Sequence, residues 1–180
     1  NDEESISLNE QIETIEFRDV EFKYPDADVP LLTNINFSAK KGEVVAFVGS
    51  TGSGKSTLIQ LIPRLFDATN GEILINNRDI KTYELHSLRQ KIGYILQKAL
   101  LFKGTIKDNI TYGMKDLDDA QIEKAIKISQ SEEFIKSKPK GILDEVSELG
   151  TNLSGGQRQR LSIARAIAKN PDIYVFDDSF

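Results

Sequence analysis

The chain has 180 residues, of which 39% are hydrophobic, and this is enough for one globular domain with its own core. Its 28 acidic residues outnumber its 23 basic ones, and the resulting net charge of -5 argues against a nucleic-acid-binding surface, which is usually strongly basic. Because cysteine is absent, disulfides and thiolate metal sites are excluded. No apolar stretch approaches the roughly 20 residues of a membrane-spanning helix, and residues 1–4 lack the basic start of a signal peptide.

The first half of the chain has the pattern of strands followed by a helix. Residues 1–12 are polar and acidic, and we expect a frayed terminus or a linker there. Alternating apolar residues predict strands within 15–24 and at 35–39. The β-branched apolar run 44–48 predicts a buried parallel strand, and residues 58–62 predict a helix.

Between this predicted strand and helix lies a phosphate-binding P-loop, which fits the pattern G-x-x-x-x-G-K-[ST]. Its residues are Gly49, Ser50, Thr51, Gly52, Ser53, Gly54, Lys55, Ser56 and Thr57. The glycines permit backbone angles that a Cβ forbids, so that the amides and the positive end of the helix form an anion cradle. We expect Lys55 to reach the β- and γ-phosphates and Ser56 to ligate Mg²⁺. A chance glycine-rich turn is the alternative, and the flanking strand and helix argue against it.

The middle of the chain changes from strand to helical patterns. Strands are predicted at 72–75 and at 92–96, the second of which ends at Gln97. Residues 98–153 form a mainly helical insertion, in which the helix 118–130 begins with an aspartate cap.

The last part of the chain predicts a second half for the nucleotide site. A helix opens at 154–156, and the apolar strand 173–176 ends in Asp177 and Asp178. An acid at the end of an apolar strand, well past a P-loop, is expected to hold Mg²⁺ opposite Ser56, and we assign this role to Asp177. The alternative is a strand that simply ends in polar turn residues.

A pentapeptide at the start of the helix at 154 narrows the interpretation from P-loop proteins in general to one protein family. It consists of Leu153, Ser154, Gly155, Gly156 and Gln157. An amide-rich helix start is a second anion site, and it makes most sense facing a nucleotide outside this domain. With this motif, residues 24–180 resemble the ATP-binding cassettes of ABC transporters. The resemblance implies that the pentapeptide, the signature motif, contacts ATP held by a partner cassette, so that two ATP molecules lie between head-to-tail cassettes.

The same resemblance implies roles for residues outside the P-loop. Tyr24 is similar to the aromatic residue that stacks on adenine, with an ordinary strand-end tyrosine as the alternative. Gln97 is similar to the Q-loop glutamine that contacts Mg²⁺ and water. Residues 101–110 and 145–150 resemble exporter segments, although Ser147 and Leu149 depart from the usual glycine and arginine. These features favour an exporter over an importer.

One departure concerns catalysis. The family has a glutamate as general base directly after the metal-binding aspartate, whereas this chain has Asp178. The missing methylene withdraws the carboxylate by roughly 1.5 Å, and a misplacement near 1 Å costs about a hundredfold in rate. We therefore expect a site that binds Mg-ATP but hydrolyses it slowly, like the degenerate half of an asymmetric exporter. The resemblance implies Asp178, Gln97 and Lys55 as the catalytic residues. The alternative to a slow site is an ordinary homodimer in which Asp178 still serves as the base.

The resemblance predicts an α/β fold: a P-loop NTPase (RecA-like) core with an antiparallel β edge and a helical subdomain. The core lobe is assigned to residues 13–97 and 159–180, and the helical subdomain to 98–158. The family continues with a further loop, a strand and a catalytic histidine, so the C-terminal part of the fold is expected to be missing. His86, the only histidine, is expected on the surface.

The resemblance also implies partners. These are ATP, Mg²⁺, a second cassette that is identical or different, and an exporter membrane domain upstream in the same polypeptide. The cassette then lies on the cytoplasmic face of a membrane. Two other functions stay open: a non-hydrolytic regulatory ATP-binding partner, and a soluble cassette ATPase, against which the acidic charge argues. The transported substrate is not encoded in these residues.

Overall fold

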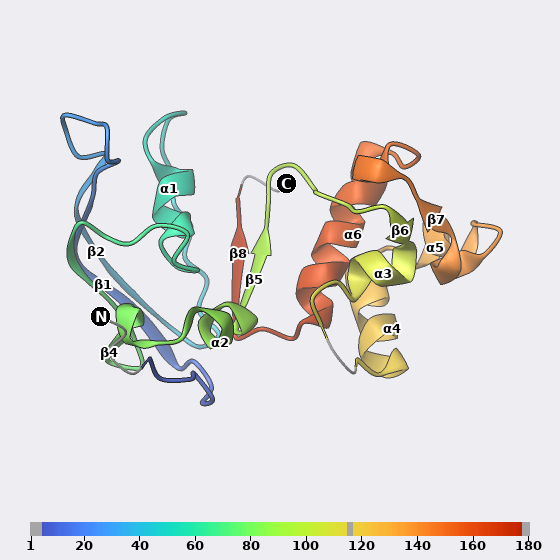
Figure 1. Cartoon of the computed structure of the whole chain (residues 1–180), viewed down its shortest axis with the longest axis horizontal. Helices are drawn as coiled ribbons and strands as arrows, with labels where there is room; N and C mark the ends of the chain where they lie inside the picture. Colours follow the sequence, from blue (N-terminus) through green and yellow to red (C-terminus); the bar gives the residue numbers. More distant parts are fainter. Residues whose placement is uncertain (1–4, 115–116, 178–180) are drawn as a thin grey trace. The chain divides into compact units, whose positions relative to one another are not determined.

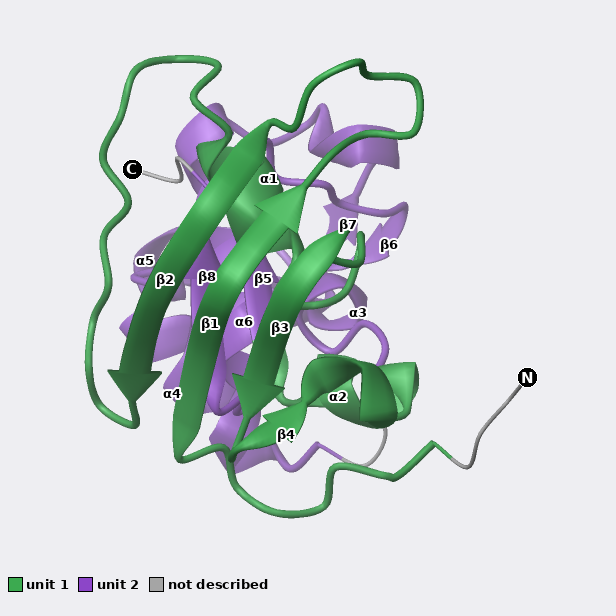
Figure 2. Cartoon of the chain, turned by 90° about the vertical axis from the view of Figure 1, so that its left-hand side faces the viewer, with its two compact units in different colours: residues 1–92 green, residues 93–180 purple. Residues whose placement is uncertain are grey.

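The computed structural model describes residues 5–114 and 117–177 (Figure 1). The chain divides into two compact units, residues 1–92 and 93–180, which Figure 2 colours separately. The helices and strands of the first unit are β1 (Thr14–Phe22), β2 (Leu32–Lys40), α1 (Lys55–Gln60), β3 (Asn70–Ile75), β4 (Arg78–Asp79), the 3₁₀ helix η1 (Ile80–Thr82) and α2 (Leu85–Gln90). Those that follow are β5 (Ile92–Ile95), β6 (Gly104–Thr105), α3 (Ile106–Ile110), α4 (Asp119–Ile128), α5 (Glu132–Lys136), η2 (Gly141–Leu143), β7 (Glu145–Val146), η3 (Glu148–Gly150), α6 (Gly155–Ala168) and β8 (Ile173–Phe176). The predicted mixed α/β class is confirmed.

The first unit is built on an antiparallel sheet in the order β2-β1-β3-β4 (Figure 2). Along β1 apolar residues alternate with polar ones, which favours a strand, and the side chains that point inward form the core. Phe17 is 1% exposed and stacks on Phe37 with ring centroids 4.4 Å apart. The predicted antiparallel edge is therefore present.

Residues 5–12 are part of this unit, which corrects the expectation of a frayed terminus for them. Ile6 pairs with Tyr83 in a parallel bridge, and the side chains of Leu8 and Ile12 are buried. The segment is polar on average, but it contains Leu8 and Ile12, and burying these two side chains stabilises the contact.

The predicted buried strand at 44–48 is wrong in this structure. Val44 and Val48 are 94% and 96% exposed, and within the described residues this run pairs with no strand. A parallel strand needs hydrogen-bonded neighbours and cover on both faces, and an apolar sequence supplies neither by itself. The contact that the run does make is local: Phe47 packs edge-on against Phe37.

The second unit has α6 at its centre, where α6 packs against α3 and α4 (Figure 1). The core there includes fully buried Ile106, Ile110 and Leu161. Strands β5 and β8 are hydrogen-bonded neighbours, and β6 pairs antiparallel with β7. The predicted strand at 173–176 forms, but in β8 only Val175 is buried.

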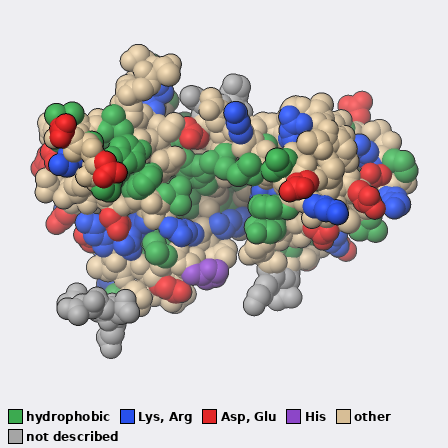
Figure 3. Space-filling model, turned by 45° about the horizontal axis from the view of Figure 1, so that its top comes forward, with side chains coloured by type: hydrophobic (Ala, Val, Ile, Leu, Met, Phe, Trp, Pro, Cys, Tyr) green, Lys and Arg blue, Asp and Glu red, His purple; other side chains and the backbone are tan. Residues whose placement is uncertain are grey.

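No helix in the described ranges combines the length and the apolar character needed to cross a bilayer. His86 is exposed, as expected, and is the purple side chain of Figure 3.

Candidate functional site

The P-loop leads directly into α1, and two of its glycines have conformations that other residues rarely adopt. Gly52 and Gly54 have φ angles of 82° and 91°. A Cβ on Gly54, the N-cap of α1, would lie 2.8 Å from Leu32 Cδ2. The loop therefore needs glycine here for its backbone angles and, at Gly54, also for space.

Lys55 is enclosed by the loop that precedes it. Its ammonium Nζ donates to the carbonyl oxygens of Gly49 at 2.7 Å and Ser50 at 3.0 Å. The Ser53 amide closes the turn by donating to Ser50 O at 3.2 Å. The first turn of α1 contains no acidic side chain, so the positive end of the helix and the ammonium both favour an anion.

Tyr24 lies beside the P-loop helix in the same unit. Its hydroxyl shares a hydrogen bond of 2.9 Å with the buried Thr57 hydroxyl. Its ring meets Phe22 and Phe66 edge-on, with centroids 4.8 and 5.5 Å away. The structure thus brings a partly exposed aromatic ring to the P-loop, while its stacking on adenine stays a prediction.

The signature motif forms the start of α6. The Gln157 amide donates to Ser154 Oγ at 3.2 Å, and the Ser154 amide donates to Gln157 Oε1 at 3.0 Å, which is a capping box. A Cβ on Gly156 would meet nothing within 4 Å, and one on Gly155 would meet only Arg158 at 3.9 Å. Packing within the chain therefore does not require glycine at either position.

Gln97 and Asp177 follow the neighbouring strands β5 and β8. The Asp177 amide donates to Ile95 O at 3.0 Å, two residues before Gln97, and Tyr94 Oη donates to Asp177 Oδ2 at 3.5 Å. Gln97 is exposed. These carboxylate and amide oxygens are hard ligands of the kind that Mg²⁺ prefers, and in the first unit the Ser56 hydroxyl is another ligand of this kind. In the described ranges no three His, Cys, Asp or Glu side chains cluster as for a protein-only metal site.

Asp178, the predicted base, lies outside the described residues.

The sequence did not reveal how Arg165 and Asn109 join α6 to the segment after Gln97. Asn109 is 1% exposed, and its side chain binds the Phe102 amide and carbonyl, both at 2.8 Å. Arg165 donates to Asn109 O at 2.7 Å and lies against the rings of Phe102 and Tyr112, and its burial lowers its pKa. No local pattern in the sequence signals this contact, because Asn109 and Arg165 lie 56 residues apart.

Arg158 also has a role that its sequence position did not show. Its guanidinium donates to Leu153 O at 2.7 Å and so supports the loop before the signature motif.

Comparison with known proteins identifies the family of this chain. The model of the family described as ABC transporter matches residues 32–180. An ATP-dependent lipid A-core flippase of Syntrophus aciditrophicus is 45% identical over 98% of this chain, and a putative multidrug export ATP-binding/permease protein of Staphylococcus aureus is 47% identical over 92%. A solved bacterial Atm1-family ABC exporter with ATP bound superposes over 98% of the chain with a TM-score of 0.91 and 38% identity.

The chain spans 29% and 28% of the two curated relatives and 31% of the solved exporter. The matched region includes the P-loop, Gln97, the signature motif and Asp177. The chain belongs to the ABC transporter family.

Proposed function

We propose that this chain is the ATP-binding cassette of an exporter, which binds and hydrolyses Mg-ATP to drive a membrane domain between conformations. The observation that carries the proposal is the P-loop: Gly52 and Gly54 have left-handed backbone angles, and the loop wraps the Lys55 ammonium. The exporter names of the relatives support the same function.

In this proposal the P-loop residues 49–57 bind the phosphates through backbone amides, and Lys55 offsets their charge. Tyr24 stacks on adenine. Ser56, Gln97 and Asp177 would hold Mg²⁺, which when bound neutralises charge on the phosphate oxygens. Gln97 also orients the attacking water, which transfers its proton to Asp178.

We further propose a head-to-tail partner cassette, whose ATP is contacted by Ser154, Gly155, Gly156 and Gln157. Helix α6 supports this, because its N-terminal glycines leave open space that a phosphate group can approach. The membrane domain lies upstream, the cassette lies on the cytoplasmic face, and the core and helical lobes have the boundaries expected from the sequence.

The shorter Asp178 makes this chain's own site slow, while the intact signature motif serves a partner's faster site. A non-hydrolytic regulatory cassette is the second candidate, and the same residue favours it. The asymmetric arrangement predicts that changing Gly155 damages turnover more than changing Asp178.

The test is phosphate release by the full parent polypeptide, reconstituted alone, with Asp178 and with Asp178→Glu. A nearly inactive native protein and a Glu variant that is about a hundredfold faster would support a weakened base. Brisk native hydrolysis with little gain in the variant would contradict asymmetry and identify an ordinary homodimeric ATPase. Lys55→Ala serves as the inactive control.

A further inference from the structure

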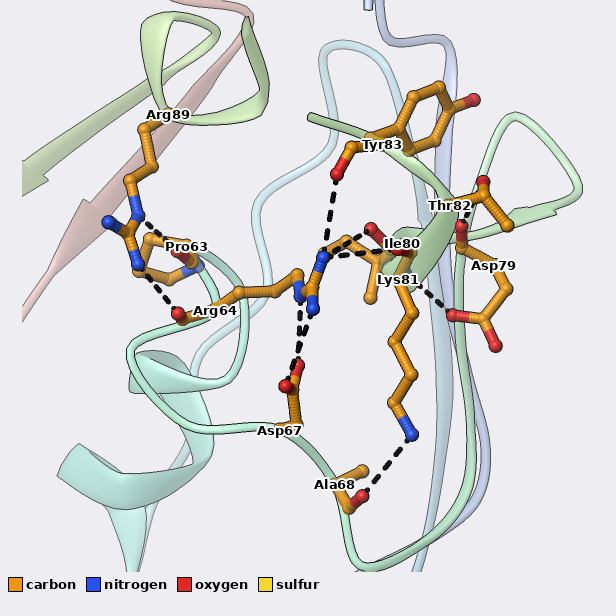
Figure 4. A network of polar contacts seen from close by, with 10 residues as sticks. All are labelled: Pro63, Arg64, Asp67, Ala68, Asp79, Ile80, Lys81, Thr82, Tyr83 and Arg89. Atoms are coloured by element: carbon orange, nitrogen blue, oxygen red, sulfur yellow. Dashed lines mark hydrogen bonds and ion pairs between the residues drawn. The ribbon is translucent and has the colours of Figure 1, made fainter. Parts of the chain in front are cut away.

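Two arginine side chains tie the segment after α1 to the segment that contains η1 and α2 (Figure 4). Arg89 donates from Nε to Pro63 O at 2.9 Å and from Nη2 to Arg64 O at 2.7 Å. Arg64 donates in return from Nη1 to Lys81 O at 3.2 Å and to Tyr83 O at 3.4 Å. Arg89 therefore binds the backbone at Arg64, and Arg64 binds the backbone six and eight residues before Arg89. We call these two residues the arginine clamp.

The clamp is held in a fixed orientation. Arg64 has a φ of 51° and donates from Nε to Asp67 Oδ1 at 2.8 Å, with only 15% of its side chain exposed. This hydrogen bond also holds the pKa of Asp67 below its usual value. Leu61 and Leu88, which lie within three residues of Arg64 and Arg89 in the sequence, are fully buried. A planar guanidinium bound at several points leaves little room for independent motion of the two segments.

The η1–α2 segment also binds residues 6–8, which we call the N-terminal strap. The Ile6 amide donates to Thr82 O at 2.9 Å, and the Glu84 amide donates to Ile6 O at 2.9 Å. The Leu8 amide donates to Ser87 Oγ at 2.9 Å. The strap and the arginine clamp therefore hold the same short stretch of chain.

We propose that this stretch relays the nucleotide state of the P-loop to the N-terminal strap, and through it to the polypeptide upstream. The relay rests on the proposed nucleotide binding. Helix α1 begins at Lys55, and the carbonyls that Arg89 binds lie three and four residues after its last residue, Gln60. A shift of α1 when phosphate binds moves these carbonyls, and the clamp passes the shift to residues 80–89. Arg64 and Arg89 are positioning residues, because neither belongs to the P-loop.

Hydrogen exchange in the full parent polypeptide tests the relay, because the Ile6, Leu8 and Glu84 amides report directly on the strap. Exchange is measured with and without the non-hydrolysable analogue adenylyl-imidodiphosphate, in the native protein and in Arg89→Lys. Lysine keeps the charge but cannot bind two carbonyls as a planar fork. The exposed Arg78→Lys in β4 is the matched control.

In the native protein the analogue should change the exchange rates of these amides. Arg89→Lys should reduce the ratio of rates with and without analogue by about two- to thirtyfold, while the affinity for the analogue changes less than this. A merely structural role for Arg89 would speed exchange equally in both conditions and leave the ratio unchanged. Ser87→Ala removes the acceptor of the Leu8 amide and should reduce the response at Ile6, and this variant leaves the arginine clamp intact.

An unchanged ratio in both Arg89→Lys and Ser87→Ala would overturn the relay. So would the absence of any response in a native protein that binds the analogue. If the native protein fails to bind the analogue at all, the proposed nucleotide binding itself is wrong, and the relay falls with it.

Discussion

At the scale of single residues, glycines in this chain are required for different reasons. Gly54 combines a left-handed φ of 91° with a close neighbour, because its Cβ would lie 2.8 Å from Leu32. Gly113 has a φ of 76° and open space around it. Gly155 has neither constraint, since no positive φ and no close contact is found there. Substitutions at these three glycines can therefore distinguish the effects of backbone strain, packing and function.

Alanine substitutions at Gly54 and Gly113 distinguish backbone strain from steric crowding of the added methyl group. Gly113→Ala should cost about 1–2 kcal/mol, from the left-handed backbone alone. Gly54→Ala should cost roughly 1–3 kcal/mol more than this, because its methyl group also overpacks against Leu32. Thermal denaturation of the nucleotide-free parent protein should therefore give the lower melting temperature for Gly54→Ala. Equal melting temperatures would show that Leu32 moves aside freely.

Gly155→Ala should affect activity without affecting stability. Alanine is about 1 kcal/mol better than glycine inside a helix, so the melting temperature should stay the same or rise slightly. Phosphate release should fall by about a hundredfold, because the methyl group displaces the phosphate of the partner's ATP. A melting temperature that falls together with activity would instead indicate a structural role for this glycine.

At the scale of elements, three helices of the second unit begin with capping boxes. The N-caps are Thr105 for α3, Asp118 for α4 and Ser154 for α6. In α3, hydrogen bonds from the Thr105 amide and hydroxyl hold the pKa of Asp108 below its usual value. This cap is therefore complete above the ordinary aspartate pKa and is lost as the pH falls through the lowered value.

The caps of α3 and α6 form a matched pair for mutation. Thr105→Ala and Ser154→Ala should each destabilise the protein by about 1 kcal/mol, because each loses one side-chain acceptor for a helix amide. Only Ser154→Ala should also reduce phosphate release beyond what its stability loss explains. Chemical denaturation and turnover measured on both variants check this, and an equal loss of turnover would remove Ser154 from the proposed site.

At the scale of the whole molecule, the chain has two compact units, and one buried apolar cluster lies entirely within the second. The P-loop belongs to the first unit, whereas the signature motif and Asp177 belong to the second. The proposed turnover therefore needs residues from both units, and the relatives are more than three times as long as this chain. Activity is accordingly a property to measure on the full polypeptide.

Nucleotide binding should stabilise the full polypeptide through linkage. ATP at about one hundred times its Kd should raise the free energy of unfolding by about 2.7 kcal/mol, seen as a higher melting temperature. Lys55→Ala should abolish this rise, because the phosphates lose their central cation. The exposed Lys124→Ala in α4 should keep it. A rise that survives in Lys55→Ala would place the ATP elsewhere.

Local patterns in the sequence were sufficient for the family, the P-loop, the signature motif and the helix caps. Each of these depends on residues within a few positions of one another, such as Asp118 with Gln121 or Ser154 with Gln157. The alternating strands β1, β2 and β3 were predicted for the same reason. Here short-range hydrogen bonds and side-chain periodicity decide the structure.

Only the tertiary structure decided features that depend on distant partners. Within the part of the chain that the structure describes, the apolar run 44–48 pairs with no strand, while the polar segment 5–12 buries Leu8 and Ile12. Arg64 and Arg89 donate hydrogen bonds to backbone carbonyls up to 26 residues away in the sequence, and no local pattern specifies these contacts. The sequence by itself determined which chemistry the chain can carry out, because motif residues are contiguous. Burial and long-range hydrogen bonds depend on what the fold brings near, and these were set by the tertiary structure.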